Sequence, residues 1–246
     1  TALHKTIKNT TVSNTKILEN ISQKALTEKL NSTQLIETYR HGKYLFIKTT
    51  NEYWLVLHFG MTGFVKYFKN KEDKPSHARL LITFNNTYHL AIDNQRLLGK
   101  IILTDDKVDY IKKMNLGKDA LRISQKDFIE VLSQRRGMIK SRLMDQSIIA
   151  GIGNIYADEI LFQTGIHPKT KMKQLHSSDL QDMYHNMKNI FDVAIKKQVN
   201  TNHFPNSFII PQRTKNGVCP KGKKKLKTVK VNGRTTYFCP VHQKQE

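Results

Sequence analysis

The segment at residues 148–159 carries the pattern with the clearest chemical use. Gly151 and Gly153 break any helix around them and let the backbone approach a ligand closely. A helix that begins at Asn154 directs its first amide N–H groups and the positive end of its dipole at an anion, and the asparagine side chain adds a donor. The pattern favours a phosphate site. Its spacing alone is weakly specific, and a plain turn between two helices is the alternative.

The charge of the chain indicates the same class of ligand. Its 246 residues include 41 Lys and Arg but 20 Asp and Glu, so the net charge is +21. An excess of this size repels itself unless the partner is a polyanion, and nucleic acid is the first candidate. A membrane is disfavoured because the sequence has no run of about 18 apolar residues and no amphipathic helix rich in Trp and Leu.

The start of the chain and its cysteines predict an intracellular protein. Thr1 follows neither an initiator methionine nor the apolar core of a signal peptide, which is typical of an internal start. Cys219 and Cys239 are too few for a disulfide framework, so a reducing compartment is the expectation. We therefore expect a cytoplasmic or nucleoid protein.

Short apolar runs in the first half predict the strands that position such a site. β-Branched and aromatic residues gather at residues 44–47, 53–57, 80–84 and 101–103, and polar turn clusters separate the runs. Antiparallel strands of this kind predict a β-sandwich domain over residues 1–118.

The pattern becomes helical in the second half. Ser124 begins one helical period, and Ser178 begins another whose apolar stripe repeats about every 3.6 residues. These periods predict a helical domain over residues 119–205. From residue 206 to 246, ten basic residues and one acidic residue accompany short strand-like pieces and an Asn-Gly turn. We expect a basic β-hairpin there, so the fold class is α+β.

Four separated motifs resemble those of the formamidopyrimidine-DNA glycosylase and endonuclease VIII family, which are base-excision repair enzymes. LMDQ at residues 143–146, GIGNIY at 151–156 and GIHP at 165–168 are together similar to the helix-two-turn-helix of the family. The other motifs are RHGKYL at residues 40–45, HFGMTG at 58–63, and NGR at 232–234 ahead of CPVH at 239–242. The resemblance covers most of the chain. It implies a β-sandwich, a helix-two-turn-helix domain and a C-terminal hairpin finger, in that order.

The resemblance also implies a site where a damaged nucleotide is flipped out of the duplex. Lys43 matches the residue that contacts the phosphate beside the lesion. His58, Asn154 and Arg234 match the residues that hold the other phosphates of the kinked strand. Each of these side chains can offer a hydrogen-bond donor to a phosphate oxygen.

Three further residues match the family's wedge, which fills the gap that the flipped base leaves. Met61 resembles the inserted side chain, and Arg96 resembles the arginine that pairs with the orphaned base. Leu98 stands where the family often has an aromatic residue, so we expect an altered wedge. Without the resemblance, Met61 would be interpreted as an ordinary core residue at the end of a strand.

The N-terminus departs from the family, whose members begin with Pro-Glu. The proline amine attacks C1′ of the damaged nucleoside, and the glutamate handles protons. Neither is present, and the segment from His4 resembles the one after the family's first long helix. We therefore expect a truncated chain with impaired catalysis. Lys43 is the candidate catalytic amine that remains, on the hypothesis that it forms an imine with an existing abasic aldehyde.

The basic hairpin also departs from the family. The four positions of the family's Cys-x2-Cys-x16-Cys-x2-Cys zinc finger are occupied by Cys219, Gly222, Cys239 and His242. Glycine has no ligand, so Cys219, Cys239 and His242 are the doubtful metal set, unless a neighbour such as His203 completes it. We expect no tightly held zinc and no cofactor in catalysis. The alternative for the two cysteines is a pair of buried, inert thiols.

These observations leave three functions open. The leading one is a monomeric DNA glycosylase and abasic-site lyase that removes oxidised or ring-opened bases from damaged double-stranded DNA. The second is a non-catalytic protein that binds damaged DNA or abasic sites. The third, a module that binds nucleic acid through charge alone, is disfavoured by Met61 and Arg96, because such a binder has no use for a wedge.

Overall fold

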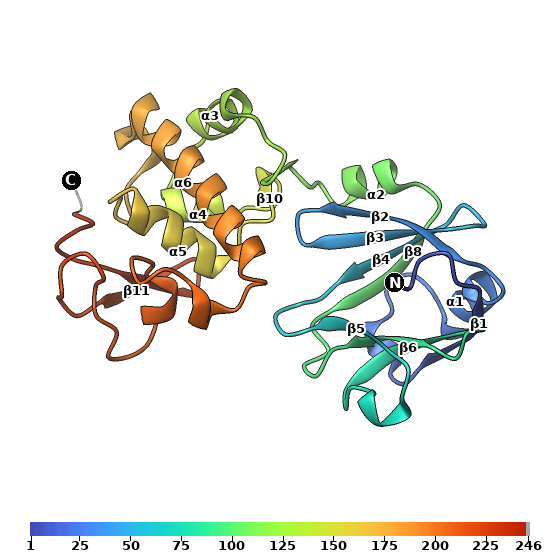
Figure 1. The fold of residues 1–246 in the computed structure, drawn as a ribbon. Helices are drawn as coiled ribbons and strands as arrows, with labels where there is room; N and C mark the ends of the chain where they lie inside the picture. The colour runs from blue at the N-terminus through green and yellow to red at the C-terminus, as the bar shows by residue number, and fades with distance from the viewer. Residues whose placement is uncertain (245–246) are drawn as a thin grey trace. The chain divides into compact units, whose positions relative to one another are not determined.

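The computed structural model describes residues 1–244. The chain forms two compact units, Thr1–Met114 and the residues from Asn115 on, and each is described by itself (Figure 1). Within residues 1–244, none of the helices has the length and apolar character needed to cross a bilayer.

The first unit is a β-sandwich of two four-stranded antiparallel sheets, as the sequence predicted. One sheet has the order β1-β6-β7-β5 and the other the order β2-β3-β4-β8 (Figure 1). On β6, buried and partly exposed residues alternate, because successive side chains of a strand point to opposite faces. Leu80 and Ile82 from one sheet and Leu55 and Leu57 from the other belong to the same buried core. The strands are β1 (Ile7–Val12), β2 (Leu35–His41), β3 (Tyr44–Thr49), β4 (Trp54–His58), β5 (Phe64–Phe68), β6 (Ala78–Phe84), β7 (His89–Asp93) and β8 (Lys100–Thr104).

Short helices complete this unit. In α1 (Gln23–Leu30) the buried residues Leu26 and Leu30 add to the core between the sheets. In α2 (Lys107–Lys113) Tyr110 packs with Phe46 and Trp54 in a second apolar cluster. Single 3-10 turns lie at η1 (Thr15–Ile17) and η2 (Lys71–Asp73).

The second unit is helical, as predicted. The helix α3 begins after Ser124, whose hydroxyl accepts the Asp127 N–H. The long helix α6 begins at Ser177 with His176 as its cap, two residues before the predicted cap Ser178, because the Asp179 carboxylate accepts the N–H of His176 at 2.7 Å. The helices are α3 (Gln125–Ser133), α4 (Ile139–Leu143), α5 (Asn154–Gln163) and α6 (Ser177–Lys196), with 3-10 turns η3 (Met172–Gln174), η4 (Thr201–His203) and η5 (Ile210–Gln212). Two short strands, β9 (Lys118–Asp119) and β10 (Ile149–Ala150), pair in parallel.

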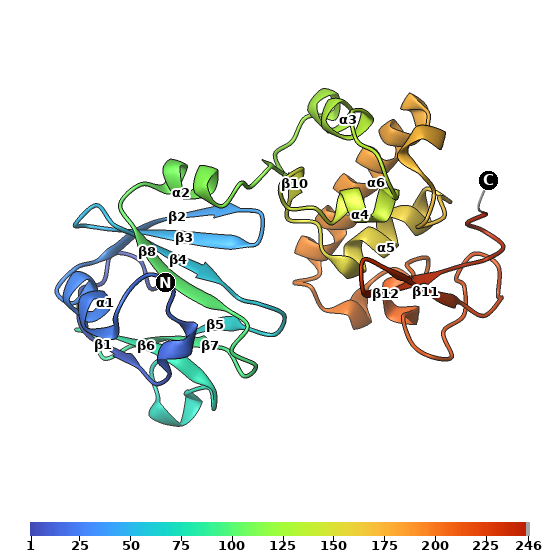
Figure 2. The ribbon, with the colours of Figure 1, turned by 180° about the vertical axis from the view of Figure 1, so that it is seen from behind.

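The predicted C-terminal hairpin is present and belongs to the same unit as the helices. It consists of β11 (Lys227–Val231) and β12 (Arg234–Phe238), seen beside α5 in Figure 2. Asn232 and Gly233 have φ values of 47° and 70°, the left-handed conformations that a two-residue hairpin turn requires. The turn therefore fixes Arg234 as the first residue of β12. Our domain boundaries at residues 118 and 205 remain predictions.

Candidate nucleic-acid interface

Three basic side chains gather at one end of the sheet β2-β3-β4-β8. Lys43 is exposed in the two-residue turn between β2 and β3. The register places Tyr44 opposite His58 on β4, and His58 opposite Lys100 on β8. Lys43 and His58, both predicted phosphate contacts, therefore lie together. Lys100 lies beside them and was missed by the sequence analysis. Its position directly before the strand predicted at residues 101–103 could have indicated it.

His58 presents a neutral N–H donor at this end of the sheet. Its Nδ1 accepts the backbone N–H of Gly60 at 3.3 Å, which assigns the ring proton to Nε2. Burial lowers the pKa of His58 below its ordinary value of 6.5, and the charges of Lys43 and Lys100 lower the pKa further. The Nε2–H of His58 is therefore a donor that carries no positive charge.

Two loops of the same unit expose the predicted wedge residues. Met61 lies in the loop between β4 and β5, and Leu98 lies in the loop between β7 and β8. Their exposed fractions are 59% and 48%, which are high for large apolar side chains. Arg96 is also exposed on the second loop. Met61 is therefore not the core residue that the alternative interpretation required.

Asn94 holds these two loops together and was missed by the sequence analysis. Its buried carboxamide donates to the Phe59 carbonyl at 3.0 Å and accepts the N–H groups of Leu98 and Gly99 at 3.0 and 3.2 Å. A Cβ at Gly63 or Gly99 would lie 2.5 or 2.3 Å from the Asn94 amide nitrogen, so both glycines are required for this close approach. In the local sequence, the only sign of this role was that Asn94 is a polar residue two positions before Arg96.

In the second unit, Asn154 begins α5 as predicted and follows a tightly built turn. Gly151 has φ of 121°, which favours glycine. Gln146 supports this turn, because its side chain accepts the Gly151 N–H at 3.0 Å and donates to the Ile152 carbonyl at 2.9 Å. No side chain caps the start of the helix at Gly153, so its first amide groups suit an anion.

The Asn154 side chain is fixed from two directions. Its oxygen accepts the Lys140 ammonium at 2.7 Å, and its amide donates to the Thr235 carbonyl at 3.1 Å. Thr235 directly follows Arg234, which is exposed. The structure therefore brings together Asn154 and Arg234, the two phosphate contacts predicted for this half of the chain.

Behind Asn154 lies a buried charge network that the sequence analysis missed. Lys140 and Asp158 form an ion pair with 2.6 Å between Nζ and Oδ1, and both side chains are fully buried. Lys140 also donates to the Thr236 hydroxyl at 2.5 Å, so its three donors are all used. Burial lowers the pKa of Lys140, and the Asp158 charge opposes that shift. On its other oxygen, Asp158 accepts Arg213 Nε at 3.0 Å and the Tyr237 N–H at 3.1 Å.

Glu159 is a second buried carboxyl group on α5. It accepts the N–H groups of Ile210 at 2.8 Å and Ile209 at 3.3 Å, and the Gln163 amide at 2.7 Å. Burial raises the pKa of Glu159 to about 7, and these hydrogen bonds oppose the shift. Glu159 therefore attaches the segment before the hairpin to α5.

The predicted metal residues do not form a metal site among the residues that the structure describes. No three His, Cys, Asp or Glu side chains of residues 1–244 are placed to share an ion, and His203 does not complete the set. Cys219 and Cys239 are buried and unoxidised. The His242 Nε2 lies 2.9 Å from the Phe162 carbonyl instead. A Cβ at Gly222 would lie 3.9 Å from the Cys219 sulfur. Position 222, the fourth of the family's zinc positions, therefore lies next to Cys219, but its glycine has no ligand atom.

Comparison with known proteins identifies both halves of the chain. The model of the formamidopyrimidine-DNA glycosylase N-terminal domain matches residues 1–101, and that of the family's H2TH domain matches residues 116–205. A formamidopyrimidine-DNA glycosylase of Lactobacillus johnsonii is 30% identical in an alignment of 230 positions that covers 87% of this chain and 82% of the relative. One of Ureaplasma parvum is 30% identical in an alignment of 252 positions that covers 95% of this chain and 90% of the relative.

Solved structures agree with these relatives. A Lactococcus lactis Fpg (MutM) in complex with FAPY-dG containing DNA is 25% identical, has a TM-score of 0.86, and aligns over 99% of this chain and 94% of its own. A complex of the same enzyme with abasic-site DNA has a TM-score of 0.85 at 25% identity, over 98% of this chain and 93% of its own. Because two models of one family match most of its length, this chain belongs to the formamidopyrimidine-DNA glycosylase family.

Proposed function

We propose that this protein is a base-excision repair DNA glycosylase with abasic-site lyase activity on oxidised or ring-opened bases in duplex DNA. The observation that carries the proposal is the pair of loops that expose Met61, Arg96 and Leu98 while Asn94 binds them to each other. An exposed apolar side chain on a braced loop suits insertion into a base stack, and an adjacent arginine suits the base left unpaired.

The first unit supplies phosphate contacts beside this wedge. In the proposed complex Lys43 attracts a phosphate by charge, and the neutral His58 donates Nε2–H to a phosphate oxygen, while Lys100 is ion-paired with Glu19 and adds less. Their common position at one sheet end suits successive phosphates of one strand.

The second unit supplies its own phosphate contacts. We propose that Asn154, the first amide groups of α5 and Arg234 bind the DNA backbone. The Lys140 network holds the Asn154 carboxamide in one orientation, which reduces the entropy lost when a phosphate binds. Together these residues would hold a kinked strand while the damaged nucleotide is extruded.

Strand cleavage separates this function from that of a damage-binding protein without catalysis. Duplexes that contain 8-oxoguanine, a ring-opened purine or an abasic site are incubated with the native protein, and its N-terminus is sequenced in parallel. The enzyme is expected to cleave lesion strands in preference to undamaged ones. Tight lesion binding without cleavage of any of the three would support the non-catalytic alternative.

Lys43 has a separate test as a catalytic amine. We propose that its neutral ε-amine adds to the C1′ aldehyde of an abasic site and loses water to form an imine, which borohydride reduces to a stable secondary amine. Trapping of the 246-residue chain on abasic DNA is expected to give a cross-linked band that Lys43→Arg removes. Persistence of the full band in Lys43→Arg, or no band in the unaltered chain, would contradict this role.

We further propose that the hairpin folds without tightly held zinc. Gly222 provides no fourth ligand, and the His242 ring is engaged by Phe162. Protein purified without chelator is expected to carry far less than one zinc per chain. Near-stoichiometric zinc would refute the proposal.

We propose that the protein acts as a monomer in the cytoplasm or nucleoid. The reason is its substrate, because one chain contacts one lesion and cellular DNA is the polyanion that suits its charge of +21. Light scattering with and without a lesion duplex measures the stoichiometry, and one chain per duplex is expected.

A further inference from the structure

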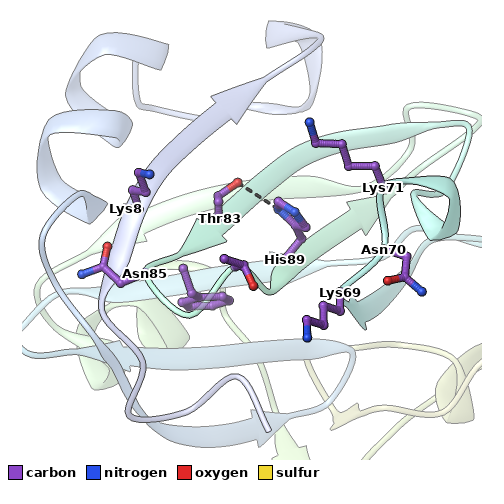
Figure 3. Close-up of a pocket in the computed structure, with 9 residues that line it drawn as sticks. Lys8, Lys69, Asn70, Lys71, Thr83, Asn85 and His89 are labelled. Atoms are coloured by element: carbon purple, nitrogen blue, oxygen red, sulfur yellow. Dashed lines mark hydrogen bonds between the residues drawn. The ribbon is translucent and has the colours of Figure 1, made fainter.

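A shallow basic pocket lies on the sheet β1-β6-β7-β5, away from the wedge loops. Its volume is about 370 Å³. It lies at the His89 end of β7, whereas Asn94 and the wedge loop follow the opposite end of that strand at Asp93. Figure 3 shows Thr83 and His89 between Lys8 and Asn85 on one side and Lys69, Asn70 and Lys71 on the other.

A β-bulge directs Lys8 into this pocket. Ile7 pairs with Phe84 and Asn9 with Thr83, so Lys8 is an extra residue with no partner of its own on β6. A bulge changes the direction of the inserted side chain, and bulges are frequent beside binding sites. Ile7 remains buried while Lys8 is exposed.

The charges of the pocket are not balanced. Three lysines line it, no carboxylate does, and within residues 1–244 none of the three forms an ion pair. Elsewhere on the sandwich, Lys48 pairs with Glu52, and Lys100 pairs with Glu19. The acidic residues nearest in sequence are Glu72 and Asp73, which follow Lys71. Asp73 is paired with Lys66, and Glu72 is exposed and does not line the pocket. Three lysines make the lining positively charged, although the Lys69 ammonium also lies 5.9 Å from the centre of the Tyr88 ring, and a bound anion would balance that charge.

Between the lysines, Thr83 and His89 supply a directed donor. Thr83 Oγ1 and His89 Nδ1 lie 3.0 Å apart (Figure 3). If the hydroxyl donates to Nδ1, the ring carries its proton on Nε2; if Nδ1–H donates, the hydroxyl proton is free to turn outward. Either arrangement leaves one N–H or O–H donor, and the amide of Asn70 or Asn85 can add another.

We propose that this pocket binds a phosphate group, carried by a nucleic-acid backbone or by a free phosphate ester. Phosphate combines the charge that three lysines balance with oxygens that accept from His89 or Thr83. The pocket is distinct from the residues that contact the lesion strand in the proposed function. Its occupancy therefore does not require a damaged base.

The first arm of the test uses inorganic phosphate and the full chain. The His89 imidazole resonances, assigned with His89→Gln, are followed by NMR during a phosphate titration at constant ionic strength. A saturable shift is expected, and in Lys8→Ser/Lys69→Ser/Lys71→Ser the affinity should fall at least about tenfold. The matched control is Lys112→Ser/Lys126→Ser/Lys196→Ser, which removes the same charge from exposed positions elsewhere. This control should keep the phosphate affinity of the unaltered chain. No shift, or an equal affinity in both triple variants, overturns the proposal.

The second arm distinguishes the sources of phosphate. Binding of an undamaged duplex is measured against salt for both triple variants. If one phosphate of the DNA backbone occupies the pocket, the slope of log K against log salt should fall by about 0.9 in the pocket variant relative to the control, since each phosphate contact contributes about 0.9. If the slopes agree while His89 responds to phosphate, the pocket takes a free phosphate ester.

Discussion

The Asn94 side chain donates to the Phe59 carbonyl at 3.0 Å, across 35 positions of the sequence. Through the same carboxamide it accepts two amides of the loop that carries Leu98. The two proposed wedge loops therefore depend on one buried side chain that itself contacts no DNA in our proposal.

Asn94→Ala is expected to lower the free energy of unfolding by about 2–3 kcal/mol, because it leaves the Leu98 and Gly99 amides without their acceptor and removes one of the two donors to the Phe59 carbonyl. It should also weaken binding to an abasic duplex at least about tenfold, because Met61 and Leu98 lose their fixed positions. Urea denaturation and fluorescence anisotropy measure the two effects. Substitution of an exposed neighbour, Gln95→Ala, is the control. Equal binding of the abasic duplex by both variants would contradict the role of Asn94 in holding the two loops together.

Met61→Ala is expected to separate binding from stability. The side chain is 59% exposed, so the free energy of unfolding should change by less than about 0.5 kcal/mol. Affinity for abasic DNA should fall at least about tenfold, and affinity for undamaged DNA should change little. Val108→Ala, at 54% exposure in the same unit, is the matched control. If Met61→Ala lost affinity equally for damaged and undamaged duplexes, Met61 would not act as a wedge.

Gly222→Cys is expected to create a zinc site. The added side chain starts 3.9 Å from the Cys219 sulfur, an ordinary contact, and it completes three cysteines and His242. The His242 ring must leave the Phe162 carbonyl to bind the metal. Metal analysis should find close to one zinc per chain in this variant, and chelator should lower its Tm. Gly222→Ser is the control, and equal zinc in the two variants would contradict the prediction.

Glu159 predicts a pH dependence of stability with a definite sign. Its pKa is about 7 in the folded chain against an ordinary 4.5, so the folded state binds more protons between these values and stability falls as pH rises through that window. The free-energy difference between the unaltered chain and Glu159→Gln should therefore decline from pH 4.5 to 7 by at most about 3 kcal/mol.

Urea denaturation at several pH values measures this decline. Glu130→Gln, an exposed position on α3, provides the control slope. A difference that stays constant with pH would mean that burial does not raise the Glu159 pKa.

The sequence predicted those parts of the fold that local patterns determine. The runs at residues 44–47 and 80–84 became β3 and β6, and Asn154 begins α5. The strand β1 was missed, because only Ile7 and Val12 in its six residues are apolar. Its pairing with β6, and not a local pattern, makes this segment a strand.

The functional side chains that the sequence predicted belong to local motifs, whereas those that it missed have partners far away in the sequence. Met61 and Arg234 could be found from short motifs. Asn94 and Lys140 could not, because their partners lie up to 35 and 96 positions away and no local period records such contacts. The sequence therefore identified most of the groups proposed to touch DNA, with Lys100 the exception, while only the structure shows the side chains that hold them.

The buried Lys140 connects α4 to partners on α5 and on β12 of the hairpin. If β12 detached alone, Lys140 would lose the Thr236 hydroxyl, Asp158 would lose the Tyr237 amide, and two desolvated charges would be left short of partners. Fraying of the hairpin is therefore coupled to opening of the helices. In native-state hydrogen exchange, the Tyr237 amide should exchange at the rate of the α5 core, although it lies in a short basic hairpin near the end of the chain.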